Sequence, residues 1–462
     1  MRAFIGSGRN RGAAAAVAVL VALPALAALS GCDKVDHDNI DKWLETENGA
    51  EKLKKALKSS DHDADLRAHA AENLILHPEG QFVEVKDAFG DMEENEQHAI
   101  MAALVPRLWE KATSGPDDPM KVSQTNIQAK DALFELRQYA DEATRAKLDG
   151  YLVEWLTKFY EGRAQTGRVS GRTIIREVGK LAAPKLLEEA RSLLVKPPGA
   201  EGERLKVGDE LLVGLAWSGS PEAAGLLMDM VTKDYKDESL PKRAIAALHE
   251  AYVEPVTGTP LPAREALTPH ISKLADVAKN ESLPGVMNND AIELIAAIGP
   301  PECIQPFVDM AALPTVRRDF RWTGVQRGLR CGGAAAVIPI LDTVPTNNWY
   351  ERALLDKYIW KEILAAPGGS KVAEQVRQLL SSQSWVARVT GVEVLGAMSE
   401  GKDTAAEEAK RIRALAGDRT VLKEWWGKPK PGEKKRPDPT LGQVATEVAG
   451  RLEGLAKGTK TK

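Results

Sequence analysis

The chain has 462 residues, of which 43% are hydrophobic and 28% are charged, so it can bury a sizeable core and is not a disordered protein. It carries 62 Lys and Arg against 66 Asp and Glu, and this slightly acidic balance gives no electrostatic support for binding nucleic acid. Three cysteines exclude a disulfide-rich scaffold and a multi-cysteine zinc module.

Residues 1–31 have the organisation of a secretory signal peptide. Arg2, Arg9 and Arg11 precede the uncharged and mostly Ala segment Ala13–Leu29. A membrane-spanning helix is disfavoured, because this segment is only weakly apolar and Pro24 interrupts it. Its removal would leave 59 basic against 66 acidic residues.

The signal ends in a Leu-Ser-Gly-Cys motif at Cys32, which resembles the lipobox of bacterial lipoproteins. The resemblance implies cleavage before Cys32 and lipidation of that cysteine, so residues 32–39 would form a short tether between a membrane and the body. We therefore expect a protein of the bacterial cell envelope, anchored in either the inner or the outer membrane. An ordinary signal peptide followed by an incidental cysteine is the alternative.

A triplet of small or apolar residues, two adjacent and a third three positions later, recurs along the body of the chain. Such a triplet lies on one face of a helix. The eleven triplets begin at Ala70, Ile100, Ala132, Ile174, Leu211, Ala244, Ala291, Gly324, Ile359, Gly391 and Val448. Seven of the ten intervals lie between 30 and 37 residues, which predicts a repeat of two helices per unit.

Short openings that begin with glycine at Gly219, Gly299 and Gly332 follow three of these triplets and are typical of a tight helix–helix turn. The segment Asp63–Leu74 resembles the second helix of a HEAT repeat, and Ala387–Gly396 matches it nearly as well. The openings are similar to those of the HEAT-like repeats named after phycobilisome lyases. The family's arginine stands at Arg67, Arg321 and Arg388, where the resemblance implies a buried ladder with acidic residues of neighbouring turns.

The predicted fold is an all-α solenoid of about eleven stacked HEAT-like helical hairpins over residues 40–455, with a disordered tail at 456–462. Residues 110–205 are the least typical part. Three insertions interrupt the repeat, at 162–172, 254–263 and 423–439, and the last of these is basic and rich in Pro.

Catalytic signatures are almost absent from the sequence. It contains no nucleophile elbow, no phosphate-binding Walker loop and no H-E-x-x-H zinc motif. HEAT-type iron hydroxylases use several His-Glu pairs, whereas this chain has one, His249-Glu250. His62 and His69 are interpreted as solvated residues near a helix start. We therefore expect no enzyme activity, no cofactor and no metal site.

Cys303 and Cys331 lie in adjacent predicted repeats, at the same end of a helical hairpin. An exported protein meets an oxidising compartment, so a disulfide between them is one prediction. Two buried free thiols are the alternative.

The segment 317–330 is the best predicted partner-binding element. Its triplet places Arg321 on the packed side, whereas Trp322, Gln326, Arg327 and Arg330 are expected to project away from the core. In HEAT-like solenoids the second helices line the concave surface, and Trp and Arg are frequent in binding hot spots. Solvated side chains without a partner are the alternative.

A second binding candidate is Trp425-Trp426, within the basic insertion 423–439. These residues would dock a partner or lie against a bilayer interface. The alternative is an insertion that packs one of the two tryptophans on the last repeat.

The leading functional hypothesis is a lipid-anchored, non-catalytic scaffold that binds an unknown protein or peptide on its concave surface. A ligand-handling or lyase-like envelope protein with a pocket in the solenoid is the second hypothesis. Self-assembly through the solenoid ends is the third.

Overall fold

The computed structural model describes residues 34–78, 80–115, 118, 121–195, 207–235, 237–254, 260–314, 318–429, 432 and 434–459. Within these residues every regular element is a helix, and extended pairing is limited to an isolated bridge between Val421 and Thr440. This part of the chain is therefore all-α. The signal segment and Cys32 lie outside it, so signal cleavage and lipidation stay predictions.

The chain divides into two compact units, and the boundary falls within α7 (Glu142–Thr157). The first unit extends to Leu148, apart from residues 118–120. Its helices are α1 (His37–Trp43), α2 (Gly49–Lys58), α3 (Ala64–Ile75), α4 (Phe82–Gly90), α5 (Glu94–Thr113) and α6 (Gln124–Leu136), followed by the 3₁₀ turn η1 (Arg137–Tyr139).

The second unit begins at Asp149 and holds the longer series of helices. In its first half lie α8 (Tyr160–Arg163), α9 (Gly171–Val195), α10 (Asp209–Trp217), α11 (Pro221–Thr232), α12 (Leu240–Tyr252), the 3₁₀ turns η2 (Arg264–Ala266) and η3 (Thr268–His270), α13 (Ile271–Lys279) and α14 (Gly285–Ile298). In its second half lie α15 (Ile304–Ala311), α16 (Arg318–Gly332), α17 (Ala334–Thr343), α18 (Arg352–Leu355), the π turn η5 (Asp356–Trp360), α19 (Lys361–Ala365), α20 (Gly369–Leu379), α21 (Trp385–Ser399), α22 (Ala405–Arg413) and α23 (Leu441–Thr459).

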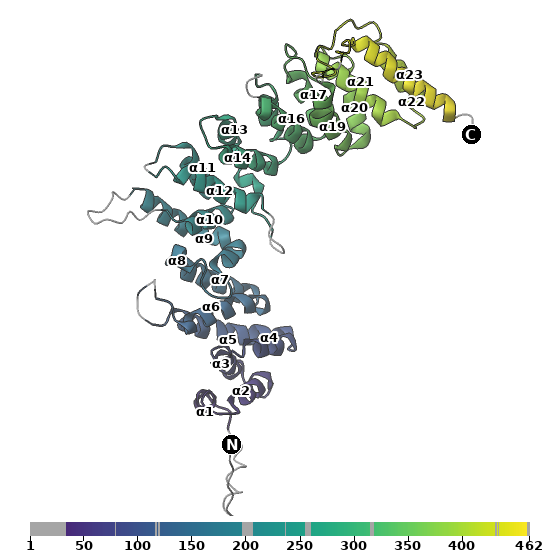
Figure 1. Cartoon of the computed structure of the whole chain (residues 1–462). Helices are drawn as coiled ribbons and strands as arrows, with labels where there is room; N and C mark the ends of the chain where they lie inside the picture. Colours follow the sequence, from purple (N-terminus) through teal and green to yellow (C-terminus); the bar gives the residue numbers. More distant parts are fainter. Residues whose placement is uncertain are drawn as a thin grey trace, which may run out of the picture. The chain divides into compact units, whose positions relative to one another are not determined.

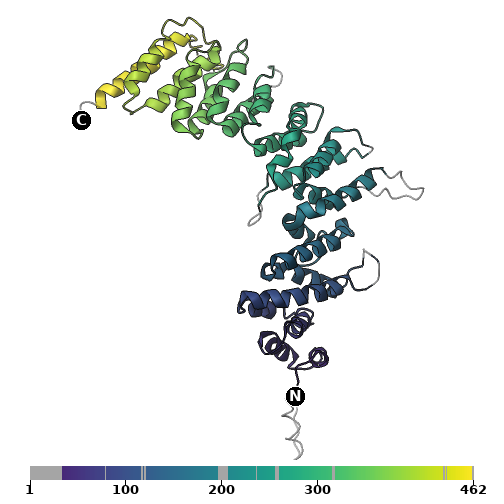
Figure 2. The same ribbon diagram turned by 180° about the vertical axis from the view of Figure 1, so that it is seen from behind.

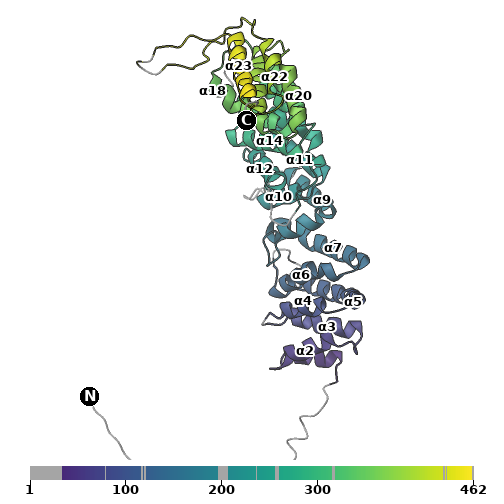
Figure 3. The same ribbon diagram turned by 90° about the vertical axis from the view of Figure 1, so that its right-hand side faces the viewer.

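Within the second unit, successive helices lie side by side in chain order (Figures 1 and 2). Figure 3 shows α10, α12 and α14 along one side of this unit, and α9 and α11 along the other. The contacts agree, because α12 packs against both α10 and α14. Each helix therefore buries its apolar side against its neighbours in the series.

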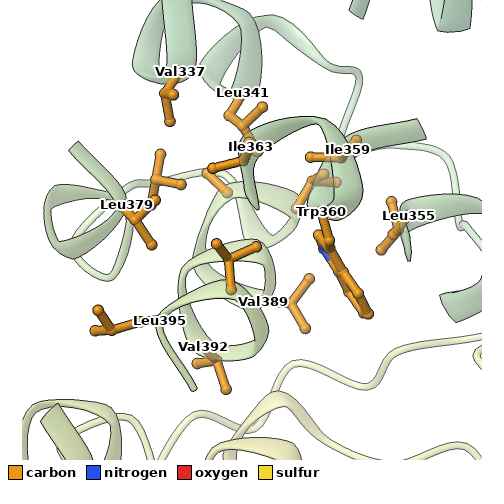
Figure 4. Packing of buried hydrophobic residues seen from close by; sticks show 14 of the residues in the cluster. Val337, Leu341, Leu355, Ile359, Trp360, Ile363, Leu379, Val389, Val392 and Leu395 are labelled. Atoms are coloured by element: carbon orange, nitrogen blue, oxygen red, sulfur yellow. The ribbon is translucent and has the colours of Figure 1, made fainter. Parts of the chain in front are cut away.

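The triplets predicted from the sequence form the centre of this packing. All three residues of every triplet are buried. From α15 to α23 the buried side chains merge into one continuous cluster, part of which is shown in Figure 4 around Trp360. Because a helix repeats every 3.6 residues, the triplet spacing keeps the three side chains on one face.

The pairing of helices departs from the prediction where the sequence is least typical. The triplet at Ile174 was expected on a second helix, but α9 packs beside α10 and α11 on the side of the first helices. Among the described residues, no separate helix lies between α5 and α6 or between α9 and α10. The helix that precedes each of these gaps is long and contains an internal proline, Pro106 in α5 and Pro184 in α9.

Glycines end helices where the sequence predicts turns. Gly219 has φ +62° and Gly299 has φ +86°, values that favour glycine because it lacks a Cβ. At the third opening the left-handed residue is Gly333, one position after the predicted Gly332. The expected disordered tail is wrong in part, because α23 continues to Thr459. Leu, Ala and Lys at residues 455–457 favour helix formation, so the helix continues past Leu455.

Candidate partner-binding site

Trp322 does not project away from the core, which corrects the prediction. Only 3% of it is exposed. Its ring stacks on Tyr358 with centroids 5.2 Å apart and meets the edge of Tyr350 at 5.4 Å. The segment that follows α17 supplies both tyrosines and covers this side of α16, so two faces of the helix are packed rather than one.

The polar side chains of α16 extend towards carboxylates on neighbouring helices. Arg330 forms two hydrogen bonds of 2.6 Å with Glu362 of α19, and these bonds raise the pKa of the guanidinium. Gln326 donates to the same carboxylate at 3.0 Å, and Arg327 forms an ion pair with Glu293 of α14. These side chains therefore join α16 to α14 on one side and to α19 on the other. The side chain of Arg330 remains half exposed.

Arg67 and Arg388 share a structural role at the junction of two helices. Arg67 donates from Nε to the carbonyl oxygen of Leu57 at 2.9 Å, and Arg388 donates from Nη1 to that of Ser382 at 2.9 Å. Both carbonyls lie at or just after the C-terminal end of the preceding helix, where carbonyls lack a partner within the helix. Each arginine also reaches a carboxylate, Glu96 at 3.3 Å for Arg67 and Asp418 at 3.0 Å for Arg388.

Arg321 has the same position and is completely buried. Its Nε donates to the carbonyl oxygen of Leu313 at 2.8 Å, just after α15, and its Nη1 donates to the hydroxyl of Tyr350 at 2.9 Å. The Tyr350 hydroxyl in turn donates to the carbonyl oxygen of Pro345 at 2.8 Å. Where an acidic ladder partner was expected, these contacts are to carbonyl and hydroxyl oxygens.

Asn288 performs this role where the sequence lacks the family's arginine. Its side-chain amide donates to the carbonyl oxygens of Val277 at 2.7 Å and Asn280 at 3.0 Å, at the end of α13. Asn288 stands three residues before the triplet at Ala291, the position that these arginines hold before their own triplets. A short amide suffices here because the carbonyls lie close to α14.

Ion pairs between helices recur on either side of α16. Arg172 of α9 binds Glu210 of α10 at 2.6 Å and Glu250 of α12 at 2.9 Å, and the bond to Glu210 raises the pKa of the guanidinium. Arg352 of α18 binds Glu393 of α21 through two contacts of 3.1 Å. A face built in this way is matched in charge by its own side chains.

Cys303 and Cys331 are joined by a disulfide bond, with Cα atoms 6.7 Å apart. Cys303 precedes the first residue of α15, and Cys331 lies in the last turn of α16. The bond therefore closes the antiparallel pair of α15 and α16, and it fixes the end of α16 that carries Arg330.

The two adjacent tryptophans of the C-terminal insertion have opposite environments. Trp425 is 2% exposed and packs against Trp360, with ring centroids 6.2 Å apart. Its carbonyl oxygen accepts a hydrogen bond of 3.0 Å from the backbone N–H of Arg352. Trp426 is 47% exposed. Glu424 immediately before them has φ +61°, a left-handed conformation that costs roughly 1–2 kcal/mol and turns the chain at this point.

A pocket of about 710 Å³ lies in the second unit, between α9, the start of α11 and η2. Its volume is in the range of small-molecule sites. The hydroxyl of Ser220 donates to Glu222 at 2.6 Å and lowers the pKa of that carboxyl. The lining residues are Lys180, Ala183, Pro184, Leu187, Arg191, Gly219, Ser220, Pro221, Glu222, Ala263, Glu265 and Ala266.

His69 is buried rather than solvated, which corrects the sequence-based interpretation. Its Nδ1 lies 2.8 Å from Nδ1 of His37, and its Nε2 lies 2.8 Å from Asp41, so it fastens α1 to α3. The spacing of residues in the sequence could not predict this contact, because α1 is too short to show a helical pattern. His249 lies 3.5 Å from Glu254.

Neither a metal-binding cluster nor a membrane-spanning helix lies within the residues that the structure describes. No group of three or more His, Cys, Asp or Glu side chains there is placed to hold a metal ion. None of the helices in that part combines the length and the apolar character needed to cross a bilayer.

Comparisons with known proteins find similarity among solved structures. No family model and no curated protein matches the chain. Among solved structures, human deoxyhypusine hydroxylase in complex with glycerol aligns with 78% of this chain and 98% of its own, at 14% identity and a TM-score of 0.21. A similarity of this size carries no argument about substrate or mechanism.

The expectation that the chain is not an enzyme does not stand beside this match to a hydroxylase, although the match itself assigns no activity to the chain. The earlier expectation depended on missing short motifs. Catalytic residues can come from several helices of a repeat without forming such a motif, so the missing motifs do not exclude catalysis.

Proposed function

We propose that the chain is a lipid-anchored α-solenoid protein of the bacterial envelope, built largely from stacked HEAT-like helical pairs. It binds a protein or peptide partner along the face that carries Gln326 and Arg330. The observation that carries the proposal is the short link between Cys32 and the body: α1 begins at His37, and Ile40 is already completely buried. A lipid on Cys32 would therefore hold the packed helices beside a membrane.

The partner site rests on the polar face around α16. Arg330 keeps an exposed guanidinium while its bonds to Glu362 fix its direction. An arginine held in this way loses little side-chain freedom when it binds a partner. The disulfide between α15 and α16 fixes the same end of the helix.

The anchor is tested by fractionating cells that produce the Cys32→Ser variant. We expect the wild-type chain in the membrane fraction and the variant in the soluble envelope fraction or as an unprocessed precursor. Equal, detergent-sensitive membrane association of both proteins, with normal processing, would overturn the lipid anchor.

The partner site is tested by crosslinking in cells, capture of the chain and mass spectrometry. The test variant carries Gln326→Ala and Arg330→Ala, and it keeps the buried Trp322. The matched control is Arg411→Ala, which removes an exposed arginine paired with Glu407 on α22. A partner that is lost only in the test variant supports the face around α16, whereas equal capture by all three proteins would place the site elsewhere.

A second candidate function is the handling of a small ligand, and the pocket at α9, α11 and η2 favours it. Its lining combines apolar side chains with Lys180, Arg191 and Glu265, a mixture that suits an amphipathic ligand with both charges. Native mass spectrometry of the purified chain tests this function. A bound species that disappears in Ala263→Trp, which fills the pocket, supports it, and an identical spectrum of both proteins counts against it.

A further inference from the structure

The C-terminal loop, residues 423–439, is a built element whose two arms lie together. Val421 and Thr440 form an antiparallel bridge at its base. Backbone hydrogen bonds from Leu422 to Pro439 at 2.8 Å and from Leu441 to Thr420 at 2.9 Å extend this pairing. The loop is therefore attached at its base on both sides, and Trp425 fixes it to the helices below.

The attached loop presents one aromatic side chain to solvent. The indole N–H of Trp426 donates to the carbonyl oxygen of Pro437 at 3.1 Å, and the guanidinium of Arg436 lies over its ring at 5.5 Å. Nearly half of Trp426 remains exposed despite these contacts, and Val421 at the base of the loop is 44% exposed.

The loop is basic in a chain that is acidic overall. Its described residues include five basic side chains against two acidic ones, Glu424 and Asp438. All five basic side chains are exposed, and Lys435 lies near Asp438 at 3.7 Å. The basic residues are Lys423, Lys428, Lys434, Lys435 and Arg436.

We infer that the C-terminal loop binds the surface of an anionic bilayer, with Trp426 at the level of the headgroups and the basic residues facing lipid phosphates. Trp is enriched at membrane interfaces because its ring is apolar and its N–H is polar. Lysines and arginines beside such a residue are attracted by anionic lipids. A diffuse headgroup layer suits these charges, because they are exposed and spread along both arms of the loop.

This contact goes beyond the lipid anchor and does not depend on it. It would give the second unit a membrane contact of its own, whatever the fate of Cys32. The test therefore uses the full chain with Cys32→Ser, so that a failure of the loop to bind is distinguishable from a failure of lipidation.

The experiment measures flotation of this protein with vesicles of phosphatidylcholine alone and with vesicles that contain equal amounts of phosphatidylglycerol and phosphatidylcholine. We expect binding that requires phosphatidylglycerol and falls as salt rises. Charge reversal at Lys434, Lys435 and Arg436 to Glu should reduce this binding about tenfold or more, and Trp426→Ala should reduce it about threefold or more.

Matched controls make the same change of charge and remove a similarly exposed apolar side chain elsewhere in the second unit. Exposed Lys371, Lys402 and Lys410 are changed to Glu, and exposed Leu364 is changed to Ala. Retained binding by both controls, with loss in the loop variants, supports the inference. Equal binding by all variants, no requirement for phosphatidylglycerol, or preferential binding of a poly-glutamate peptide over the vesicles would overturn it.

Discussion

The face of α16 and the C-terminal loop both combine basic side chains with tryptophan, but they use these residues differently. On α16 the guanidinium of Arg330 is bound by Glu362, and Trp322 is inside the core. In the loop the basic side chains are exposed and Trp426 is half exposed. The difference lies in the neighbours: α14 and α19 present carboxylates to α16, whereas few acidic residues accompany the loop.

The comparison indicates how one composition serves two purposes. Charges that are paired between helices join neighbouring helices, and the arginine of each pair remains partly exposed. Exposed charges on an attached loop remain available to an external surface. The predictions that follow test this division, from the largest expected effect to the smallest.

Trp425 and Trp426 should differ most clearly. Trp425→Ala removes a buried aromatic ring that packs on Trp360, so we expect the free energy of unfolding to fall by about 3–5 kcal/mol. Trp426→Ala should change it by less than about 1 kcal/mol. Urea unfolding followed by circular dichroism measures both. Similar losses for the two variants would show that the loop is not divided into a buried and an exposed tryptophan.

Arg321 and Arg330 make the same contrast within one helix. Arg321→Ala leaves the Leu313 carbonyl and the Tyr350 hydroxyl without this donor inside the core, so we expect a loss of about 3 kcal/mol. Arg330→Ala removes the exposed member of the pair and leaves the buried Glu362 with Gln326 as a donor, so it should cost only about 1–2 kcal/mol. The same urea titration separates them, and an equal cost would contradict the assignment of Arg321 to the core.

The disulfide between Cys303 and Cys331 should stabilise the pair of α15 and α16. A bond between residues separated by 28 positions restricts the unfolded chain, so Cys303→Ser with Cys331→Ser should lower the free energy of unfolding by about 3 kcal/mol. A reducing agent should have a comparable effect on the wild-type chain and no effect on the double variant. Cys32→Ser, which leaves both of these cysteines in place, should keep the full sensitivity to reduction.

Much of the helical packing could be predicted from the sequence, because it depends on residues close together in the chain. The triplet at Leu211, for example, needs only neighbours within one turn to define a buried face. The prediction weakened for α9, since a long helix with a good triplet can occupy either side of the series. Its place is decided by contacts with α10 and α11, which spacing alone does not encode.

The candidate site was harder to predict for the same reason. A helical projection distinguishes the strongly packed side of α16 from the rest, but it cannot show that Tyr350 and Tyr358 cover Trp322. It also cannot show that the exposed guanidinium of Arg330 donates hydrogen bonds to Glu362, which lies 32 residues later in the chain. The sequence also could not show which of the adjacent residues Trp425 and Trp426 is buried, because that depends on the left-handed turn at Glu424.

The smallest expected effect tests whether carboxylates alone distinguish the two regions. Glu293→Gln with Glu362→Gln keeps the shape of both side chains and an oxygen that accepts hydrogen bonds, but it leaves Arg327 and Arg330 without a counter-charge. If the loop binds anionic vesicles through unpaired charge, this variant should bind phosphatidylglycerol vesicles about two- to fivefold more tightly at low salt than its parent with Cys32→Ser.

The control for this gain is Glu407→Gln, which removes one of the two carboxylates paired with the exposed Arg411 on α22 and changes the net charge by half as much. The double variant removes two negative charges and the control removes one. A gain in vesicle binding at α16 that is larger than this difference in charge accounts for, and that disappears at high salt, would show that paired carboxylates normally exclude the membrane from that face. No gain at all would mean that the display of Trp426 on an attached loop, rather than free charge, makes the C-terminal region different, because the α16 face offers cations without an exposed aromatic ring.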